Sequence, residues 1–184
     1  MTMSNLRKYR NNSPQISSTV YIDSTATIIG DVEIGADSSV WPQSVIRGDV
    51  NRIRVGARSN IQDGCIIHVS RPTSSLPDGH PTLIADDVTI GHGAILHGCS
   101  IACCVLVGNG AVVMDGVCIE SHVIVGANSL VPPGKTLSSG YLYIGSPCQQ
   151  ARKLTDAEIQ NLQTSANNYV ALKDEYLDAE KINP

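Results

Sequence analysis

Two histidines in a glycine-rich segment are the first candidates for chemistry. Residues 90 to 99 have the sequence IGHGAILHGC, with His92 and His97 five positions apart. Helical metal sites place two histidines four positions apart on one face, and the surrounding glycines make a helix unfavourable here. A third histidine, His68, ends the segment CIIH. These imidazoles can serve one metal ion only if another regular fold brings them together.

The composition excludes several classes of protein. The chain of 184 residues has a net charge of −4 and no long Lys/Arg cluster, so the positive surface of a nucleic-acid-binding protein is missing. No apolar segment has the length of a membrane span, and the N-terminus lacks the apolar core of a signal peptide. We therefore predict a cytoplasmic protein with no nucleic-acid or membrane partner. Its six cysteines are expected to be free thiols because the cytosol is reducing, and no CxxC pair supports a cysteine zinc site.

A six-residue repeat dominates the sequence. Short strands joined by tight corners keep such a period, with three units per triangular coil and the repeated residue facing inward. Three extra residues between Ile46 and Val55, and eleven between Ile67 and Ile84, are predicted to form loops. The pattern predicts a parallel β-helix and leaves its handedness open. The repeated residues are Ile22, Ile28, Ile34, Val40, Ile46, Val55, Ile61, Ile67, Ile84, Ile90, Leu96, Ile101, Val107, Val113, Ile119, Val125, Val131, Leu137 and Tyr143.

The repeat divides the chain into three parts. We predict an N-terminal arm over residues 1–18, the β-helix domain over 19–148 and a C-terminal helical segment over 149–184. A capping-box sequence, TDAE, and the apolar stripe that follows it predict a helix from about Asp156 to Ala179. The apolar face of this helix is expected to pack on the β-helix or on a neighbouring subunit.

The repeat also places the histidines. Residues three units apart stack in one column about 4.8 Å apart, so His68 and His97 occupy one position on successive coils and can share a metal ion. His92 lies one unit earlier, at another corner, where one chain cannot easily bring it to the other two. Threefold packing of β-helices would create three sites of three histidines at the subunit interfaces. Three imidazoles with one open position are typical of catalytic zinc, which lowers the pKa of a bound water to roughly 7.

Other polar residues share these columns. Arg47 is predicted to lie below His68, and Gln62 and Asp63 to lie below the turn that contains His92. An ion pair between Arg47 and Asp63 across the subunit boundary follows, with a bidentate guanidinium available for it. Two interpretations of this pair stay open, since it either orients the metal site or serves only as an interface salt bridge.

Several segments resemble the γ-class carbonic anhydrase family and, within it, the YrdA-type γ-carbonic-anhydrase-like proteins. They are WPQSVIRGDV, RVGARSNIQDGCIIHV, IGHGAILHGC and SANNYVALKDEYLD, and the resemblance extends over nearly the whole chain. It implies an all-β fold, a left-handed parallel β-helix followed by the C-terminal helix, assembled as a homotrimer. It also implies one Zn²⁺ ion, with Fe²⁺ or Co²⁺ possible, at each interface, bound by His68 and His97 of one subunit and His92 of the next.

The resemblance further implies roles for residues around the metal. Gln62 would hydrogen-bond near the reactive water, Arg47 would pair with Asp63, and Tyr169 would lie near the site. The residues to which the family assigns such roles are Arg47, Asp49, Asn60, Gln62, Asp63 and Tyr169.

Two departures from the family pattern concern proton transfer. Val50 stands where the family prototype has a glutamate, and Arg71 stands where it has a proton-shuttle glutamate. Hydration of CO₂ releases one proton in every turnover, so missing proton carriers should slow the reaction even at an intact metal site. His80 in the intervening loop is a possible substitute. We therefore expect weak or undetectable hydration of CO₂ to bicarbonate.

Three other functions stay open. The same metal chemistry can hydrolyse a small ester or thioester, and a trimer of this kind can bind a metal or small ligand without catalysis. Hexapeptide β-helices also include acyltransferases that use one histidine as a base, although such enzymes need neither three ligating histidines nor a metal.

Overall fold

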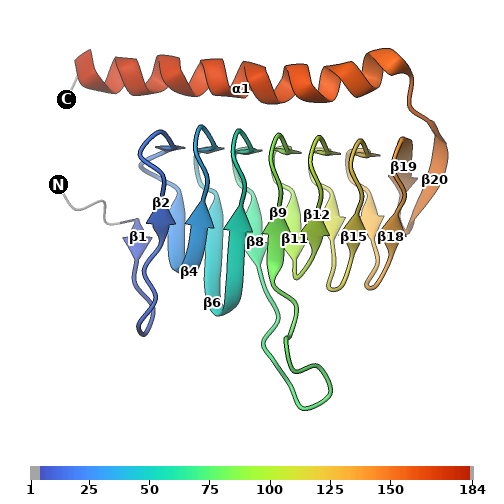
Figure 1. Ribbon diagram of the computed structural model, residues 1–184, viewed down its shortest axis with the longest axis horizontal. Helices are drawn as coiled ribbons and strands as arrows, with labels where there is room; N and C mark the ends of the chain where they lie inside the picture. The colour runs from blue at the N-terminus through green and yellow to red at the C-terminus, as the bar shows by residue number, and fades with distance from the viewer. Residues whose placement is uncertain (1–4, 183–184) are drawn as a thin grey trace.

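The computed structural model describes residues 5–182, which form a parallel β-helix and one long helix (Figure 1). The elements in chain order are β1 (Leu6–Arg7), β2 (Gln15–Ile16), β3 (Tyr21–Ile22), β4 (Thr27–Ile34), β5 (Ser39–Val40), β6 (Val45–Val55), β7 (Asn60–Ile61), β8 (Ile66–His68), β9 (Thr82–Ile84), β10 (Thr89–Ile90), β11 (Ile95–His97), β12 (Ser100–Ile101), β13 (Leu106–Val107), β14 (Val112–Val113), β15 (Cys118–Ile119), β16 (Ile124–Val125), β17 (Leu130–Val131), β18 (Thr136–Leu137), β19 (Tyr141–Gly145), β20 (Cys148–Lys153) and α1 (Asp156–Ile182).

The strands form the three faces of a triangular, left-handed β-helix. Face A contains β1, the first halves of β4 and β6, then β8, β11, β14 and β17. Face B contains β2, the second halves of β4 and β6, then β9, β12, β15 and β18. Face C contains β3, β5, β7, β10, β13, β16 and β19. All of these pairings are parallel, and β20 alone returns antiparallel along β19.

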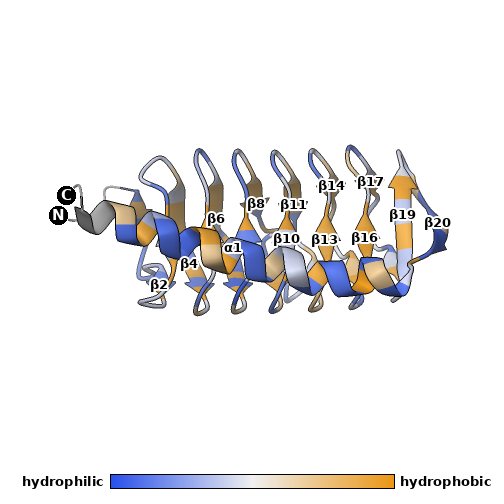
Figure 2. Ribbon diagram, turned by 90° about the horizontal axis from the view of Figure 1, so that it is seen from above, coloured by the Kyte–Doolittle hydropathy of each residue, from blue (hydrophilic) through white to orange (hydrophobic). Residues whose placement is uncertain are grey.

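The core is the stack of repeated aliphatic residues. On face A the paired residues are Ile28, Ile46, Ile67, Leu96, Val113 and Val131, and each has an exposed fraction of 0%. Because each inward residue lies directly on its equivalent in the next coil, the core needs no large aromatic side chain. This confirms the predicted repeat, and Figure 2 shows the apolar strands alternating with polar corners.

Two segments differ from the sequence-based expectation. The three extra residues before Val55 form no separate loop but a bulge within β6, because the pairing with β4 shifts by three residues between Gly48 and Ile53 and resumes over residues 53–55, where β9 pairs on the other side. The segment expected to be an N-terminal arm contributes β1 and β2, which pair with β4. The eleven extra residues after Ile67 do form a loop, which projects from the coil between β8 and β9 (Figure 1).

Helix α1 runs back along its own β-helix and contacts β3, β5 and β10 on face C. It begins at Asp156 as predicted, where Thr155 and Glu158 exchange the hydrogen bonds of a capping box. It ends at Ile182, later than expected, and β20 occupies the start of the segment predicted to be helical. Lys173 of α1 is also buried between the helix and the β-helix, with an exposed fraction of 2%. Its ammonium group forms an ion pair with Asp37 at 3.3 Å.

Candidate metal centre

His68 and His97 lie side by side on face A. They are paired residues of β8 and β11, which confirms that they share one column on successive coils. Nδ1 of His68 lies 3.1 Å from Nε2 of His97. The corner beside them is held by Thr82, whose hydroxyl donates to the carbonyl of His68 at 2.6 Å and accepts from the backbone of Gly98.

A carboxylate stands at each end of this histidine pair. Oδ1 of Asp49 lies 2.9 Å from Nε2 of His68, and Oδ1 of Asp115 lies 2.9 Å from Nδ1 of His97. If both outer nitrogens donate to these carboxylates, the inner nitrogens of two neutral rings direct lone pairs at each other. A cation between the rings relieves this repulsion. Two nitrogens bound to one tetrahedral zinc at about 2.05 Å would be about 3.3 Å apart, so the observed spacing suits a metal ion.

Arg47 supports this corner from the coil below. Its guanidinium forms an ion pair with Oδ2 of Asp49, while Oδ1 of the same carboxylate faces His68. Burial acts to raise the pKa of Asp49, but hydrogen bonds from His68 and Arg47 outweigh it and hold the pKa below its ordinary value. Asp49 therefore stays ionised and ready to accept a hydrogen bond. We call Arg47, Asp49, His68 and His97 the His68 half-site.

His92 lies at a different corner, after β10 of face C. Nδ1 of His92 lies 2.8 Å from Oδ2 of Asp63, which belongs to the equivalent turn one coil earlier. Tyr169 on α1 packs at this corner over Trp41, which lies one coil below Gln62, and burial and then the negative charge of Asp63 raise its pKa. Its ring packs edge-on against Trp41, with the centroids 5.6 Å apart.

Gln62 and Asn60 are buried beneath α1 at the same corner. Gln62 donates to Oδ1 of Asn60 at 3.1 Å, and Asn60 donates to Oγ1 of Thr89 at 3.0 Å. The Thr89 hydroxyl in turn lies 3.3 Å from the hydroxyl of Ser165 on α1. A chain of hydrogen bonds thus joins the strand residues to the helix. We call Asn60, Gln62, Asp63, His92 and Tyr169 the His92 half-site.

The structure of one chain therefore divides the predicted site residues between two corners. Among the residues it describes, no three His, Cys, Asp or Glu side chains form a group that can hold a metal ion. Arg47 pairs with Asp49 rather than with Asp63 inside the chain, so the pair across a subunit boundary stays a prediction. Both corners border face A, whose outward side chains lie between them.

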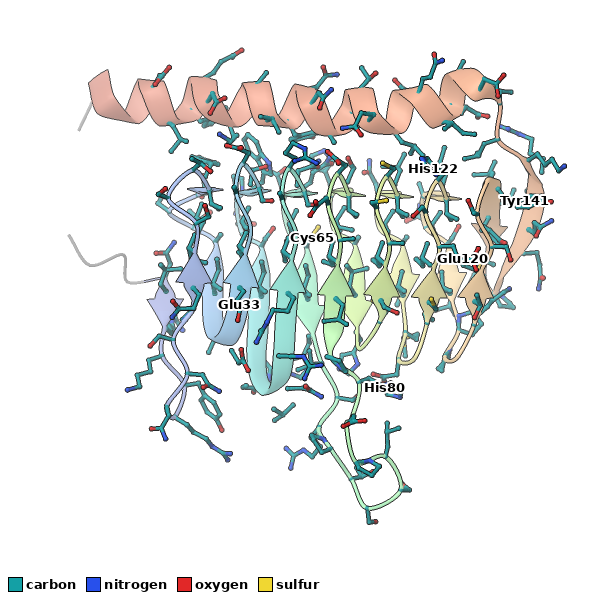
Figure 3. The ribbon with its side chains drawn as sticks, in the orientation of Figure 1. Glu33, Cys65, His80, Glu120, His122 and Tyr141 are labelled. Carbon is teal, nitrogen blue, oxygen red and sulfur yellow. The ribbon has the colours of Figure 1, made fainter. Side chains whose placement is uncertain are left out.

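The departures Val50 and Arg71 also have defined positions. Val50 is half-buried against the hydrophobic core, and Arg71 is exposed in the projecting loop. His80 lies at the base of that loop (Figure 3), where its backbone pairs with Ser70. Two further residues escaped the sequence analysis: Asp115, which faces His97, and Ser70, which donates to Asp115 at 2.9 Å.

The cysteines do not add ligands to either corner. Within the described residues Cys65, Cys99 and Cys148 are buried and none of the six forms a disulfide. Burial raises the pKa of Cys99 to about 12, so its thiol stays protonated and is a poor metal ligand.

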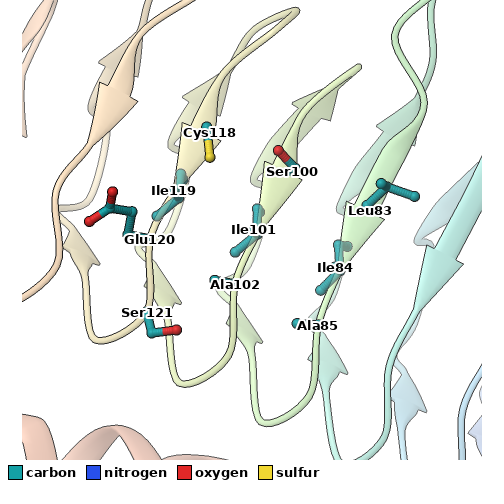
Figure 4. A pocket seen from close by; sticks show the side chains of 10 residues that line it. All are labelled: Leu83, Ile84, Ala85, Ser100, Ile101, Ala102, Cys118, Ile119, Glu120 and Ser121. Carbon is teal, nitrogen blue, oxygen red and sulfur yellow. The ribbon is translucent and has the colours of Figure 1, made fainter. Parts of the chain in front are cut away.

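A surface depression of about 440 Å³ lies on face B and is lined by β9, β12 and β15 (Figure 4). None of the histidines lines this depression.

No helix in the described part of the chain combines the length and apolarity that crossing a membrane requires.

Comparison with known proteins agrees with this architecture. Residues 13–48 match the bacterial transferase hexapeptide family (six repeats). The protein YrdA of Escherichia coli strain K12 is 53% identical over 173 residues, which cover 94% of each chain. The probable carbonic anhydrase of Methanocaldococcus jannaschii is 45% identical over 159 residues, covering 86% of this chain and 96% of that relative.

A solved structure shows the same fold. The crystal structure of a hexapeptide transferase family protein from Anaplasma phagocytophilum has a TM-score of 0.87 at 42% identity, covering 93% of this chain and 97% of that one. With identities of this size over nearly the full length, the chain belongs to the γ-carbonic-anhydrase-like family of hexapeptide-repeat proteins.

Proposed function

We propose that this protein is a cytoplasmic homotrimer that binds one divalent metal ion at each subunit boundary and hydrates CO₂ slowly. The observation that supports the proposal best is the row of Asp49, His68, His97 and Asp115, in which two inner nitrogens face each other 3.1 Å apart between two carboxylates. His92 of the next subunit would supply the third ligand through Nε2, because its Nδ1 faces Asp63. Zn²⁺ suits three imidazoles, and so do Fe²⁺ and Co²⁺.

The outward surface of face A supports the threefold assembly. A column of aliphatic side chains runs along it between the two half-sites, with Ile66 and Ile95 exposed at 46% and 37%. The column consists of Val45, Ile66, Ile95, Val112 and Leu130. A ring that joins the His68 half-site of each subunit to the His92 half-site of the next turns face A toward the symmetry axis. Burial of this column then stabilises the same interface that completes the metal site.

The chain's own residues prepare the reaction. His68 and His97 of one subunit and His92 of the next would hold a divalent ion, whose chemistry would be to lower the pKa of a water so that it loses a proton near neutral pH. Asp49 and Asp63 would accept the outer N–H groups of His68 and His92 and so fix their tautomers. Gln62, buried and anchored on Asn60, would present its amide to the reacting oxygen. Tyr169 would limit the access of solvent beside Asp63.

Release of the proton is the expected weak step. The half-buried Val50 has no group that accepts a proton, and the Arg71 guanidinium offers hydrogen-bond donors and no acceptor. His80, at the base of the same loop, is the candidate that would replace the missing proton carriers. Hydration of CO₂ should therefore depend strongly on external buffer, and hydrolysis of a small ester is the second reaction to examine.

Light scattering and elemental analysis of protein produced with added zinc test the proposal. We expect a trimer with about one metal ion per chain, and chelation should lower the melting temperature because the ion binds only the folded assembly. Stopped-flow CO₂ hydration and 4-nitrophenyl acetate hydrolysis then define the activity. A monomer, or a trimer without bound metal after zinc supplementation, would contradict the proposal.

A further inference from the structure

Asp115 lies beyond the residues to which the family resemblance assigns a role. We propose that Asp115, held in place by Ser70, is a positioning residue that fixes the ring orientation and tautomer of His97, an inference that rests on the metal site proposed above. Oδ1 of Asp115 lies 2.9 Å from Nδ1 of His97 and 2.9 Å from the hydroxyl of Ser70. Through this contact the carboxylate would direct Nε2 of His97 toward the ion.

The geometry of the corner allows this approach. Val113 pairs with Leu96 in adjacent coils, so Asp115 lies in the turn directly over Gly98, next to His97. Gly98 has a φ of +58°, and a Cβ built on it would lie 2.2 Å from Oδ1 of Asp115. Only a glycine leaves room for the carboxylate to reach the histidine ring. The same absent side chain also makes room for the base of the loop, since that Cβ would lie 2.6 Å from Cβ of His80.

Ser70 is itself fixed from two directions. Its carbonyl accepts a hydrogen bond from Nδ2 of Asn51 at 3.0 Å, and its backbone pairs with His80 across the base of the loop. Its hydroxyl is therefore aimed at Asp115 by backbone contacts that do not depend on His97. This arrangement connects the projecting loop to a proposed metal ligand through one hydrogen-bonded carboxylate.

Asp115 gives the three proposed ligands equivalent surroundings. Asp49 faces His68, Asp63 faces His92 and Asp115 faces His97, each at 2.8 to 2.9 Å. A carboxylate that accepts N–H from the outer nitrogen of a ligating histidine fixes its tautomer, and loss of such a partner typically weakens metal binding about 10- to 100-fold. An exposed ion pair without this role would contribute little. The tautomer of the His97 ring therefore distinguishes a positioning role of Asp115 from a simple exposed ion pair.

The test compares D115A, D115N and S70A with D86A in the full-length trimer. Asp86 is a turn aspartate whose carboxylate accepts from the backbone of Ala57 at another corner, so D86A matches the substitution without touching a histidine. Zinc affinity, measured by competition with a chromophoric chelator, should fall about 10- to 100-fold in D115A. It should fall less in D115N, whose amide oxygen still accepts a hydrogen bond, and less again in S70A, while D86A matches the wild type.

Ring ¹⁵N spectra of the metal-free protein provide the second measurement, with His97 assigned by comparison with H97A. The wild type should hold the proton on Nδ1 of His97, and D115A should show a mixture of tautomers. A D115A protein that stays trimeric with unchanged zinc affinity and an unchanged tautomer would overturn the role of Asp115. If the wild type bound no zinc, the proposed function would fail, yet the tautomer comparison would still decide whether Asp115 positions the ring.

Discussion

The two half-sites are built on different principles. In the His68 half-site the rings of His68 and His97 stack on adjacent coils, and each ring nitrogen has a partner within 3.1 Å. In the His92 half-site a single ring faces Asp63 through one nitrogen, and the two side chains are 52% and 49% exposed. The first half-site is formed by the β-helix alone, whereas the second lies at an exposed corner.

This difference follows from what lies next to each corner. The His68 corner is packed by the coils above and below, which supply Asp115 and Asp49 from the same repeat. The His92 corner is supported laterally by α1, which contributes Tyr169 and continues the hydrogen-bond chain through Ser165. A β-helix can therefore stack two ligands by its period, but it cannot bring a ligand from another corner to them. In the proposed assembly a second copy of the chain would supply that ligand.

Mixing two variants that each lack a metal ligand would give the strongest test of whether the two half-sites of different chains form one metal site. H97A and H92A should each bind no metal, because each homotrimer then lacks one ligand at all three boundaries. After subunit exchange every hybrid trimer contains one boundary that joins the intact His68 and His97 of an H92A chain to the intact His92 of an H97A chain. One metal ion should return per hybrid, measured by native mass spectrometry.

The same spectra contain the control, since unmixed trimers of either variant must stay metal-free. Hybrids that form without binding metal would mean that the two half-sites do not meet.

An acidic residue on face A should separate the half-sites without touching either. Ile95 is exposed in one chain, and the proposed assembly buries it, so I95D places a charge in an apolar interface at a cost of several kcal/mol. We expect light scattering to show monomers and elemental analysis to show loss of metal. Leu83, which projects from face B, provides the matched control, and L83D should stay trimeric and metal-bound. Equal behaviour of the two variants would remove face A from the interface.

The sequence alone predicted the His68 half-site better than the His92 half-site. A fixed six-residue period determines which residues stack, so the pairing of His68 with His97 followed from counting, and the structure confirms it. The same count places Asp115 over Gly98, but an aspartate followed by glycine is so typical of turns that its type gave no indication of a contact with histidine.

The contribution of α1 was less predictable for a physical reason. An amphipathic stripe indicates that one face of a helix packs on another surface, but it does not determine the register, that is, which helix residues lie over which coils of the β-helix. Tyr169 was therefore expected near the site only by resemblance. Lys173 was missed altogether, because a lysine is seldom buried and its pairing with Asp37 depends on that register. The extra residues predicted as a loop before Val55 lie in a bulge within β6, because pairing with β4 resumes at Ile53 three residues out of register.

Glutamates at positions 50 and 71, where the chain departs from the family pattern, should raise the rate of CO₂ hydration at the metal-bound site several-fold. V50E with R71E would supply carboxylates that accept the released proton, so CO₂ hydration should increase most at low buffer concentration, measured by stopped flow. V50Q with R71Q removes the same side chains without adding a proton acceptor and should leave the rate low. Fast turnover by the unaltered chain, or equal rates for the two double variants, would show that proton release does not limit this protein.

The smallest expected effect concerns the packing of α1 against the β-helix. This packing bears on the comparison because only the His92 half-site includes a residue of α1. Asp87 accepts hydrogen bonds from Arg58 at 2.8 and 2.6 Å and from Gln163 of α1 at 2.8 Å. Burial acts to raise the pKa of Asp87, but these bonds outweigh it and hold the pKa below its ordinary value. The carboxylate therefore stabilises the fold above about pH 4, and this contribution is lost as the pH falls through the lowered pKa.

D87N should accordingly cost about 1 kcal/mol at pH 7, since solvent screens the 41% exposed Arg58 side chain and reduces the value of the pair. The measurement is urea unfolding of D87N in the H97A background, where metal binding does not contribute. Trp41 is the single tryptophan and contacts Tyr169 and Tyr176, so its emission reports α1 docking directly. The difference between D87N and its parent should shrink as the pH is lowered from 7 to 3, whereas D86N should show no change in docking. A difference that grew on acidification would mean that Asp87 is not held ionised by Arg58 and Gln163, and that α1 is fixed by its apolar contacts alone.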